Sequence, residues 1–294
     1  MKVLIIGGGA AGMMAAISAA DHGAQVILAE RNEKLGKKLY ITGKGRCNLT
    51  NACPTEEFFD HVLSNPKFLY SAVYSFDHNA VCRFLESEGL KLKEERGQRV
   101  FPVSDKSSDV IRTLDQALRR RNVQVRLHTE IRDLIVQQPP GDCSKTSPDG
   151  SPDPSFAGVP SAPVADVPIL PSSMDRFLYP AEQGGEYQDP GHRILAVTAK
   201  GEKILSDAVI IATGGVSYPS TGSTGDGYRF AQTLGHPIVK PLPSLVPFRV
   251  RETWAGELEG LSLRNVRVTM DHFEGFGEML FTDRKSTRLN SSHD

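Results

Sequence analysis

The chain has few cysteines, almost no net charge and no long apolar run. Its four cysteines are Cys47, Cys53, Cys82 and Cys143. Their spacing matches neither a zinc site nor a C-x-x-C redox pair, so we expect reduced thiols and no metal. The formal net charge of −1 gives no overall bias towards nucleic acid or an anionic membrane. No run of about eighteen apolar residues exists, which argues against a membrane span.

What the chain does have is a complete strand–turn–helix–strand pattern in its first thirty residues. The uncharged run from Val3 to Ile6 is typical of a strand buried on both faces of a parallel sheet. Glycines with G-x-G-x-x-G spacing follow between Gly7 and Gly12, and then a helix of small apolar residues that Gly23 ends. A second apolar strand, residues 25–29, leads to Glu30. The pattern predicts a βαβ unit that binds a dinucleotide.

Each glycine of this turn has its own expected role. Gly7 allows the tight turn, Gly9 lets the backbone approach a pyrophosphate, and Gly12 lets the helix pack closely on the sheet. The free amides and the positive dipole end of the helix would then face the phosphates. Glu30 can accept hydrogen bonds from a ribose diol, and its charge disfavours a 2′-phosphate, so we do not expect an NADP-type ligand at this site.

Two other interpretations of the same stretch are disfavoured. A glycine-rich turn without a ligand would not need both strands, the helix and the acid in place. A secretory signal would not carry several glycines inside its apolar region, with a single basic residue before it and a strand continuing to Glu30. We therefore expect a cytoplasmic protein.

The segment after Glu30 is a long loop rich in glycine and basic residues. Arg46 offers a fork of donors to phosphate oxygens, and Lys37 or Lys38 a point charge. Asn48 and Thr50 can hydrogen-bond ring or ribitol edges. The alternative is an ordinary solvated loop without a ligand, which the glycine content and the position make less favoured.

Further elements follow from periodicity. They are helices over 79–88, 109–121 (capped by Ser107 or Ser108) and 226–234, a hairpin over 91–101, strands over 123–127 and 131–136, and a hairpin over 193–205. The uncharged run from Ala208 to Ala212 predicts a fully buried strand that returns to the first sheet. The Thr213-Gly214-Gly215 turn after it would pass close to a bound cofactor.

Residues 137–190 break the pattern. They hold eleven of the nineteen prolines, mixed with Ser, Asp and Gly, and no period persists. Such a segment cannot bury enough apolar surface to offset its ordering entropy. We expect a disordered, tolerated surface insertion there, with a lid or a partner-binding segment as the alternative.

Two segments carry a more specific signal. They are Gly43-Lys44-Gly45-Arg46-Cys47-Asn48-Leu49-Thr50-Asn51 and the run from Ala212 to Tyr228. Together with the glycine turn and Glu30, they resemble the bacterial BaiN-like flavoproteins (YhiN, aminoacetone-oxidase type). The resemblance implies FAD bound by an α/β fold of the two-dinucleotide-binding-domain type, with a smaller β-rich domain inserted. It also implies an adenine contact at Glu130 or Ile131.

The expected architecture is therefore a Rossmann-like FAD-binding domain over residues 1–240, interrupted at 137–190. Residues 241–282 would begin a β-rich substrate domain, with strands over 246–250, 261–270 and 277–281. Residues 283–294 form a tail without periodicity or fit to the family. Since the family continues beyond this point, the resemblance implies a C-terminally truncated chain.

The leading hypothesis is an FAD-dependent oxidoreductase, or the N-terminal portion of one, that acts on a small organic substrate by flavin-mediated hydride transfer. NAD(P)H would donate the electrons, or the substrate would be oxidised with oxygen as acceptor. The alternatives are a non-catalytic or truncated dinucleotide-binding module and an NAD-dependent Rossmann dehydrogenase. No catalytic residue, substrate or oligomeric state is assigned, and neither nucleic acid nor membrane is expected as a partner.

The expected cofactor-binding residues are Gly7, Gly9, Ala10, Ala11, Gly12, Glu30, Arg31, Lys38, Gly43, Arg46, Cys47, Asn48, Thr50, Ile131, Thr213, Gly214 and Gly215.

Overall fold

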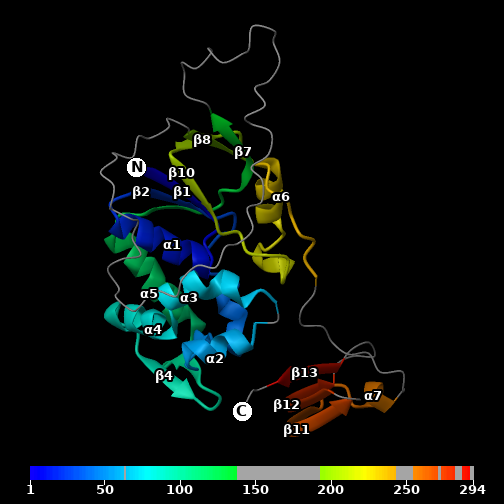
Figure 1. Ribbon diagram of the computed structural model, residues 1–294. Coiled ribbons are helices and arrows are strands. Elements are labelled where there is room, and N and C mark those ends of the chain that lie inside the picture. Colours follow the sequence, from blue (N-terminus) through cyan, green and yellow to red (C-terminus); the bar gives the residue numbers. More distant parts are fainter. Residues whose placement is uncertain (63, 138–192, 243–253, 271–272, 282–286, 292–294) are drawn as a thin grey trace.

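Figure 1 shows the computed structural model of the 294-residue chain. The structure describes residues 1–62, 64–137, 193–242, 254–270, 273–281 and 287–291. The insertion expected at 137–190, apart from its first residue, and the strand expected at 246–250 lie outside the described residues.

A four-stranded parallel sheet forms the centre of the N-terminal part. Its strand order is β10 (Ala208–Ile211), β1 (Lys2–Ile6), β2 (Gln25–Ala29) and β6 (Gln124–Arg126). The strand expected to return from position 208 therefore does pair with β1, with Val3 opposite Ala208. Parallel neighbours joined by long crossovers are the Rossmann arrangement that the sequence predicts.

The helices of the described residues are α1 (Ala10–Asp21), η1 (Leu39–Gly45), α2 (Thr55–Asp60), η2 (Pro66–Leu69), α3 (Tyr70–Ser75), α4 (His78–Ser87), α5 (Ser107–Arg120), η4 (Pro219–Thr221), α6 (Asp226–Thr233) and α7 (Trp254–Glu257). The other strands are β3 (Thr50–Asn51), β4 (Leu92–Glu95), β5 (Arg99–Pro102), β7 (Ile131–Gln137), β8 (Arg193–Thr198), β9 (Lys203–Ser206), β11 (Ser262–Met270), β12 (Phe273–Phe281) and β13 (Thr287–Ser291).

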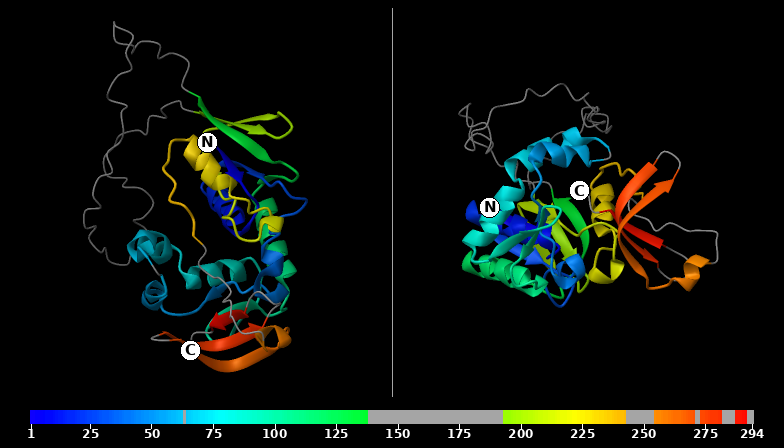
Figure 2. Two further views of the ribbon diagram at one scale, coloured as in Figure 1. Left: turned by 90° about the vertical axis from the view of Figure 1, so that its right-hand side faces the viewer. Right: turned by 90° about the horizontal axis from the view of Figure 1, so that it is seen from below.

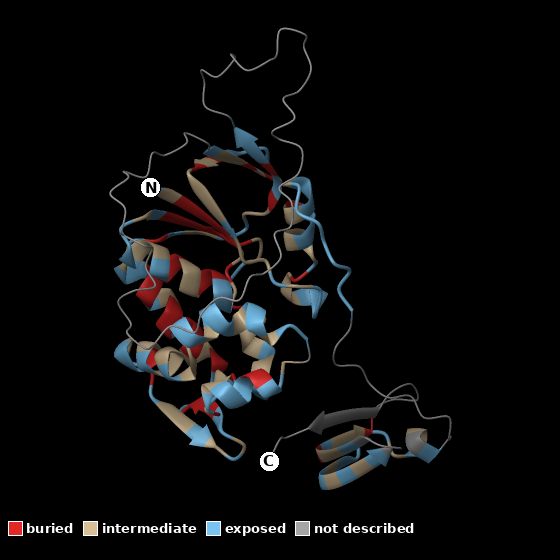
Figure 3. Ribbon diagram, viewed as in Figure 1, coloured by how far each residue is buried: buried red, intermediate tan, exposed pale blue. Residues whose placement is uncertain are grey.

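Alternation along β1 divides the core into two layers. Val3 and Ile5 pack in a cluster with side chains of α1 and α5, whereas Leu4 and Ile6 pack with side chains of β7 to β9 and α6. Because successive side chains of a strand point to opposite faces, an uncharged run is what a strand covered on both faces requires. Figure 3 shows the buried residues concentrated in this sheet and the helix beside it, and Figure 2 shows the antiparallel β7–β8–β9 layer from two further directions.

Two expectations about local structure are wrong. The strand β10 is not fully buried, because it lies at the edge of the sheet and Ile210 is 38% exposed. Neither Ser107 nor Ser108 caps α5, because the N-cap residue is Lys106 and no side chain caps the helix. The hydroxyl of Ser107 instead donates to the backbone carbonyl of Tyr40, 67 residues away, which ties α5 to η1.

The C-terminal elements include an antiparallel sheet of order β11–β12–β13. Strands β11 and β12 match the expected strands over 261–270 and 277–281, although β12 begins earlier, at Phe273. Residues 287–291 of the tail, for which no element was expected, form β13 and pair with β12. Backbone pairing needs only a free strand edge, which explains why it can occur without a hydrophobic pattern.

Candidate functional site

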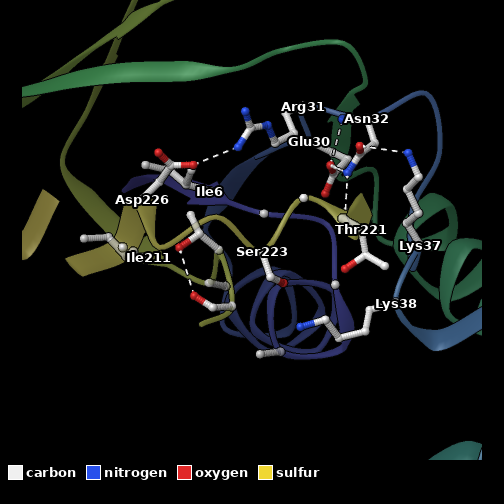
Figure 4. A pocket seen from close by; sticks show the side chains of 18 of the residues that line it. Ile6, Glu30, Arg31, Asn32, Lys37, Lys38, Ile211, Thr221, Ser223 and Asp226 are labelled. Carbon is white, nitrogen blue, oxygen red and sulfur yellow. Dashed lines mark hydrogen bonds and ion pairs between the residues drawn. The ribbon is translucent and has the colours of Figure 1, made fainter. Parts of the chain in front are cut away.

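A cavity of about 610 Å³ lies where β1, β2 and β10 end, in the size range of roughly 300–1,000 Å³ that cofactor pockets occupy. Its wall combines the start of α1, the end of β2, the 37–42 segment, the start of β7 and the 211–230 segment. Figure 4 shows the charged and polar side chains that point towards it. Ligands of parallel α/β sheets bind at this edge, beyond the carboxyl ends of the strands.

Two glycines of the turn are required by the fold itself. The N–H of Gly7 donates to the carbonyl of Ala29 (2.8 Å), and Gly7 has φ +107°, in the left-handed region. A Cβ on Gly7 would lie 2.4 Å from the carbonyl oxygen of Ala212, and a Cβ on Gly12 would lie 1.8 Å from that of Gly7. Both glycines therefore permit close packing between the turn, the helix and the residue that follows β10, whether or not a ligand binds.

Gly9 is different, because the protein does not need a glycine there. Its φ is −80°, which any residue adopts, and a Cβ would meet no atom within 4 Å. The residue lines the cavity just ahead of α1. The space that a side chain would fill is therefore open at the point where the helix begins.

The start of α1 has no side-chain cap, and its first turn holds no acidic residue. The first amides of a helix have no partner within the helix, and the dipole there is positive. With Ala10 and Ala11 in the cavity wall beside the open space at Gly9, a phosphate fits this position. The residues present thus fit the pyrophosphate of a dinucleotide.

Glu30 lies in the cavity wall, 7% exposed, and its carboxylate is held by three N–H groups. The N–H of Gly8 donates to Oε2 (2.6 Å), and the backbone N and Nδ2 of Asn32 donate to Oε1 (2.8 and 2.7 Å). Three donors offset the cost of burying the charge. The acid expected to receive a ribose is therefore fixed in place at the cavity.

The cationic side chains of the wall all have partners. Arg31 donates to Asp226 (2.8 Å) and Thr224 (2.8 Å) and forms an ion pair with Glu130 (3.4 Å). The Nζ of Lys38 donates to the carbonyl of Ser217 (2.8 Å). These contacts join the end of β2 and the following loop to the 217–226 segment, which closes one side of the cavity.

The structure separates the expected cofactor-binding residues into two groups. Those that line the cavity are Gly7, Gly9, Ala10, Ala11, Glu30, Arg31, Lys38, Ile131, Thr213, Gly214 and Gly215. Those that do not line it are Gly12, Gly43, Arg46, Cys47, Asn48 and Thr50.

Arg46 is occupied elsewhere. Its guanidinium donates to Glu95 and to Asp105 (2.6 Å) and stacks 4.1 Å from the ring centre of Phe101. The hydrogen bonds from Arg46 to Glu95 and then to Asp105 raise the pKa of Arg46 further above its usual range. The structure therefore uses the donors expected for phosphate oxygens to bind two carboxylates.

The rest of the 43–51 loop is packed rather than open. Cys47 is 1% exposed, has φ +62°, and belongs to the core cluster beside α1 and α5. Burial raises the pKa of its thiol. A Cβ on Gly43 would lie 2.7 Å from the backbone N of Asn48. Thr50, in β3, pairs with Val100 of β5. These residues shape the loop but do not reach the cavity.

Several wall residues were not singled out from the sequence as binding residues. They are Asn32, Leu39, Thr42, Thr129, Ala212, Thr221, Gly222, Ser223, Asp226, Gly227, Tyr228 and Phe230. The run from Gly222 to Tyr228 was among the segments that carry the family resemblance, and it was the available signal. Asn32 had no signal beyond its place two residues after the acid.

Other classes of site are not found in the part of the chain that the structure describes. Among those residues, no group of three or more His, Cys, Asp or Glu side chains could hold a metal ion. No helix among them is long and apolar enough to cross a membrane.

Residues 1–145 match the family described as the HI0933-like protein Rossmann domain. This stretch of the sequence is therefore similar to an HI0933-like Rossmann domain. The match agrees with the parallel sheet and the glycine turn, and it confirms the α/β expectation from the sequence.

Relatives extend the likeness beyond the HI0933-like domain. The chain is 30% identical over 253 residues to the 3-dehydro-bile acid delta(4,6)-reductase of Clostridium scindens, covering 85% of this chain and 48% of that protein. It is 25% identical over 284 residues to the ribosomal RNA dihydrouridine synthase of Haemophilus influenzae, covering 96% and 57%. The chain thus spans about half the length of the curated relatives that it matches. The resemblance to BaiN-like proteins is confirmed.

Among solved structures, the open conformation of a flavocytochrome c3 fumarate reductase matches with a TM-score of 0.50 and 18% identity. The match covers 90% of this chain and 47% of that one. At this identity the likeness shows the fold alone.

Proposed function

We propose that this chain is the FAD-binding portion of a flavin-dependent oxidoreductase. The observation that carries the proposal is the uncapped start of α1, which faces open space at Gly9 and lies beside the buried carboxylate of Glu30. An anion subsite next to a ribose acceptor is what the ADP half of FAD requires. FAD, when bound, supplies the hydride chemistry, and the protein supplies binding and orientation.

The cavity wall suggests a role for each group of residues. The amides at Gly9, Ala10 and Ala11 would bind the pyrophosphate, and Glu30 would accept from the adenosine ribose. The adenine contact inferred from the family would fall at Glu130 or Ile131, which both line the cavity at the start of β7. The Thr213-Gly214-Gly215 turn, which also lines the cavity, would let the backbone pass close to the cofactor.

The names of the relatives support a substrate class. One is named a delta(4,6)-reductase of a 3-dehydro-bile acid and the other a dihydrouridine synthase. Both names describe saturation of a C=C bond conjugated with a carbonyl group. Such a reduction adds a hydride to one carbon and a proton to the other, and NAD(P)H would be the reductant that restores the flavin. We propose that the substrate of this chain also carries a C=C bond conjugated with a carbonyl group. The sequence predicts that this substrate is a small organic molecule and not a nucleic acid, and that point stays a prediction.

The first experiment is the absorption spectrum of the purified chain, followed by release and identification of any bound cofactor. We expect flavin bands, FAD in the released fraction, and saturable binding when FAD is titrated into colourless protein. Protein that retains no flavin absorbance once unbound FAD has been removed contradicts the proposal. Preferential binding of NAD over FAD would favour a simple Rossmann dehydrogenase instead.

A second candidate, a dinucleotide-binding module without activity of its own, is favoured by one observation. The chain spans about half the length of its curated relatives, so groups that act on the substrate can lie in the part of those proteins that it does not match. Anaerobic mixing of the FAD-loaded chain with NADH or NADPH separates the two. Bleaching of the flavin supports the oxidoreductase, and binding of FAD without bleaching supports the module.

A further inference from the structure

Asn32 connects four segments around the cavity. Its backbone N and Nδ2 donate to Oε1 of Glu30, and Nδ2 also donates to the carbonyl of Thr221 (3.2 Å). Its Oδ1 accepts from Nζ of Lys37 (3.2 Å), and its backbone carbonyl accepts from the N–H of His128 (3.1 Å). Figure 4 shows Asn32 between Glu30, Lys37 and Thr221. Every polar group of this residue therefore has a partner.

The partners also determine the positions of Oδ1 and Nδ2 in the Asn32 side-chain amide. The groups on one side, the carboxylate of Glu30 and the carbonyl of Thr221, can only accept. The group on the other side, the ammonium of Lys37, can only donate. The reversed amide would place its oxygen against two acceptors, so Asn32 is held in one orientation.

This arrangement uses the two oxygens of Glu30 unequally. Oε1 accepts two hydrogen bonds, both from Asn32, and Oε2 accepts one, from the N–H of Gly8. A carboxylate offers about four acceptor positions. One position remains, and it is on Oε2. Glu30 can therefore receive one ribose hydroxyl but not both hydroxyls of the diol.

We propose that Asn32 is a positioning residue that restricts Glu30 to a single ribose hydroxyl and ties the Thr221–Gly222 turn to the same cavity wall. The inference rests on the proposed function, because it concerns the ribose of the ADP half of FAD. According to this proposal, Asn32 determines whether Glu30 accepts a hydrogen bond from one ribose hydroxyl or from both.

The test is isothermal titration calorimetry of the full chain with three probes: ADP, 2′-deoxy-ADP and 3′-deoxy-ADP. In the wild type, loss of one hydroxyl should weaken binding about tenfold or more, because a hydrogen bond to a charged group is lost. Loss of the other hydroxyl should change the affinity less than about twofold. The decisive readout is the ratio of the dissociation constants of the two deoxy probes.

The variant Asn32→Ala removes the Nδ2 donor but keeps the backbone N–H bond, so it frees one acceptor position on Oε1. The second hydroxyl then gains an acceptor, and the ratio of the dissociation constants of the two deoxy probes should fall towards one. Asn79→Ala is the matched control, since Asn79 also donates to a neighbouring carboxylate, Asp77, but at the exposed start of α4. It should leave the ratio as in the wild type.

A second variant displaces Asn32 without changing it. A Cβ on Gly222 would lie 2.7 Å from Nδ2 of Asn32, so Gly222→Ala should push the amide away and lower the ratio as well. Gly222 has φ +99°, which adds backbone strain. Gly235→Ala is the control, because Gly235 has φ +87° and a Cβ there meets no atom within 4 Å.

The outcomes are distinct. A wild-type ratio that collapses in Asn32→Ala and in Gly222→Ala, but in neither control, supports the proposal. Equal losses for both deoxy probes in the wild type overturn it, as does an Asn32→Ala variant that weakens all three probes alike with the ratio kept. A wild type that binds neither ADP nor FAD overturns the proposed function, and the inference with it.

Discussion

The glycine turn between β1 and α1 and the loop over residues 43–51 both contain glycines, but they have different roles in the structure. The turn lies in the cavity wall, where Gly9 faces open space. The loop folds away from the cavity, buries Cys47 in the core and pairs Thr50 with β5. The turn is fixed by the strand before it and the helix after it, whereas the loop depends on contacts with distant parts of the chain.

The donors of the two segments differ in the same way. The turn offers backbone amides, whose direction is set once α1 begins. The loop offers the side chain of Arg46, which binds Glu95 and Asp105, 49 and 59 residues further along. A flexible cation binds whichever anion the fold brings nearest, so its target cannot be deduced from its own segment.

Gly12→Ala should have the largest effect, on folding. Its Cβ would lie 1.8 Å from the backbone oxygen of Gly7, which no rotamer change relieves. We expect a loss of more than about 3 kcal/mol in the free energy of unfolding, measured by chemical denaturation. Unchanged stability would show that the turn and α1 can separate freely, which would contradict the close packing described for this unit.

Gly9→Ala, three residues earlier, should instead spare the fold and impair binding. Its Cβ meets no protein atom within 4 Å, and exchange of glycine for alanine at an N-cap costs roughly 1 kcal/mol or less. The methyl group would enter the space ahead of α1, so the affinity for ADP in calorimetry should fall by about tenfold or more. Normal affinity for ADP would place the phosphates elsewhere.

Arg46→Ala should leave the affinity for ADP within about twofold of the wild type, since Arg46 lies outside the cavity wall and its guanidinium pairs with two carboxylates there. Arg99→Ala is a suitable control, because Arg99 is an exposed arginine whose Nε donates to the carbonyl of Arg96. A large loss of ADP affinity in Arg46→Ala alone would return Arg46 to the phosphate role expected from the sequence.

The smallest effect should be a pH dependence of the Arg46 contacts. The hydrogen bond from Arg46 lowers the pKa of Glu95, and hydrogen bonds from Lys93 and then Arg46 lower that of Asp105. A carboxylate whose pKa is lowered by folding stabilises the protein above its ordinary pKa, and that stabilisation is lost as the pH falls through the lowered value. The difference in melting temperature between wild type and Arg46→Ala should therefore be constant near neutral pH and shrink below about pH 4.

Much of the fold was predictable because it follows from local pattern. The uncharged runs identified β1, β2 and β10, and small residues after the glycine turn identified α1. The prediction that β10 is fully buried was wrong, because the residues of a strand do not show whether it lies at the edge of a sheet. The prediction that Ser107 caps α5 was wrong, because its hydroxyl donates to the backbone carbonyl of Tyr40. Only the packing of α5 against η1 provides that partner.

The candidate site divides along the same line. The sequence by itself determined the glycine turn, the helix start and the acid at the end of β2, because these are consecutive and their geometry follows from strand, turn and helix. Only the tertiary structure decided that Arg46 binds Glu95 and Asp105 and that Asn32 joins Glu30 to Thr221. Side chains choose partners by proximity in space, and the sequence order does not contain that proximity.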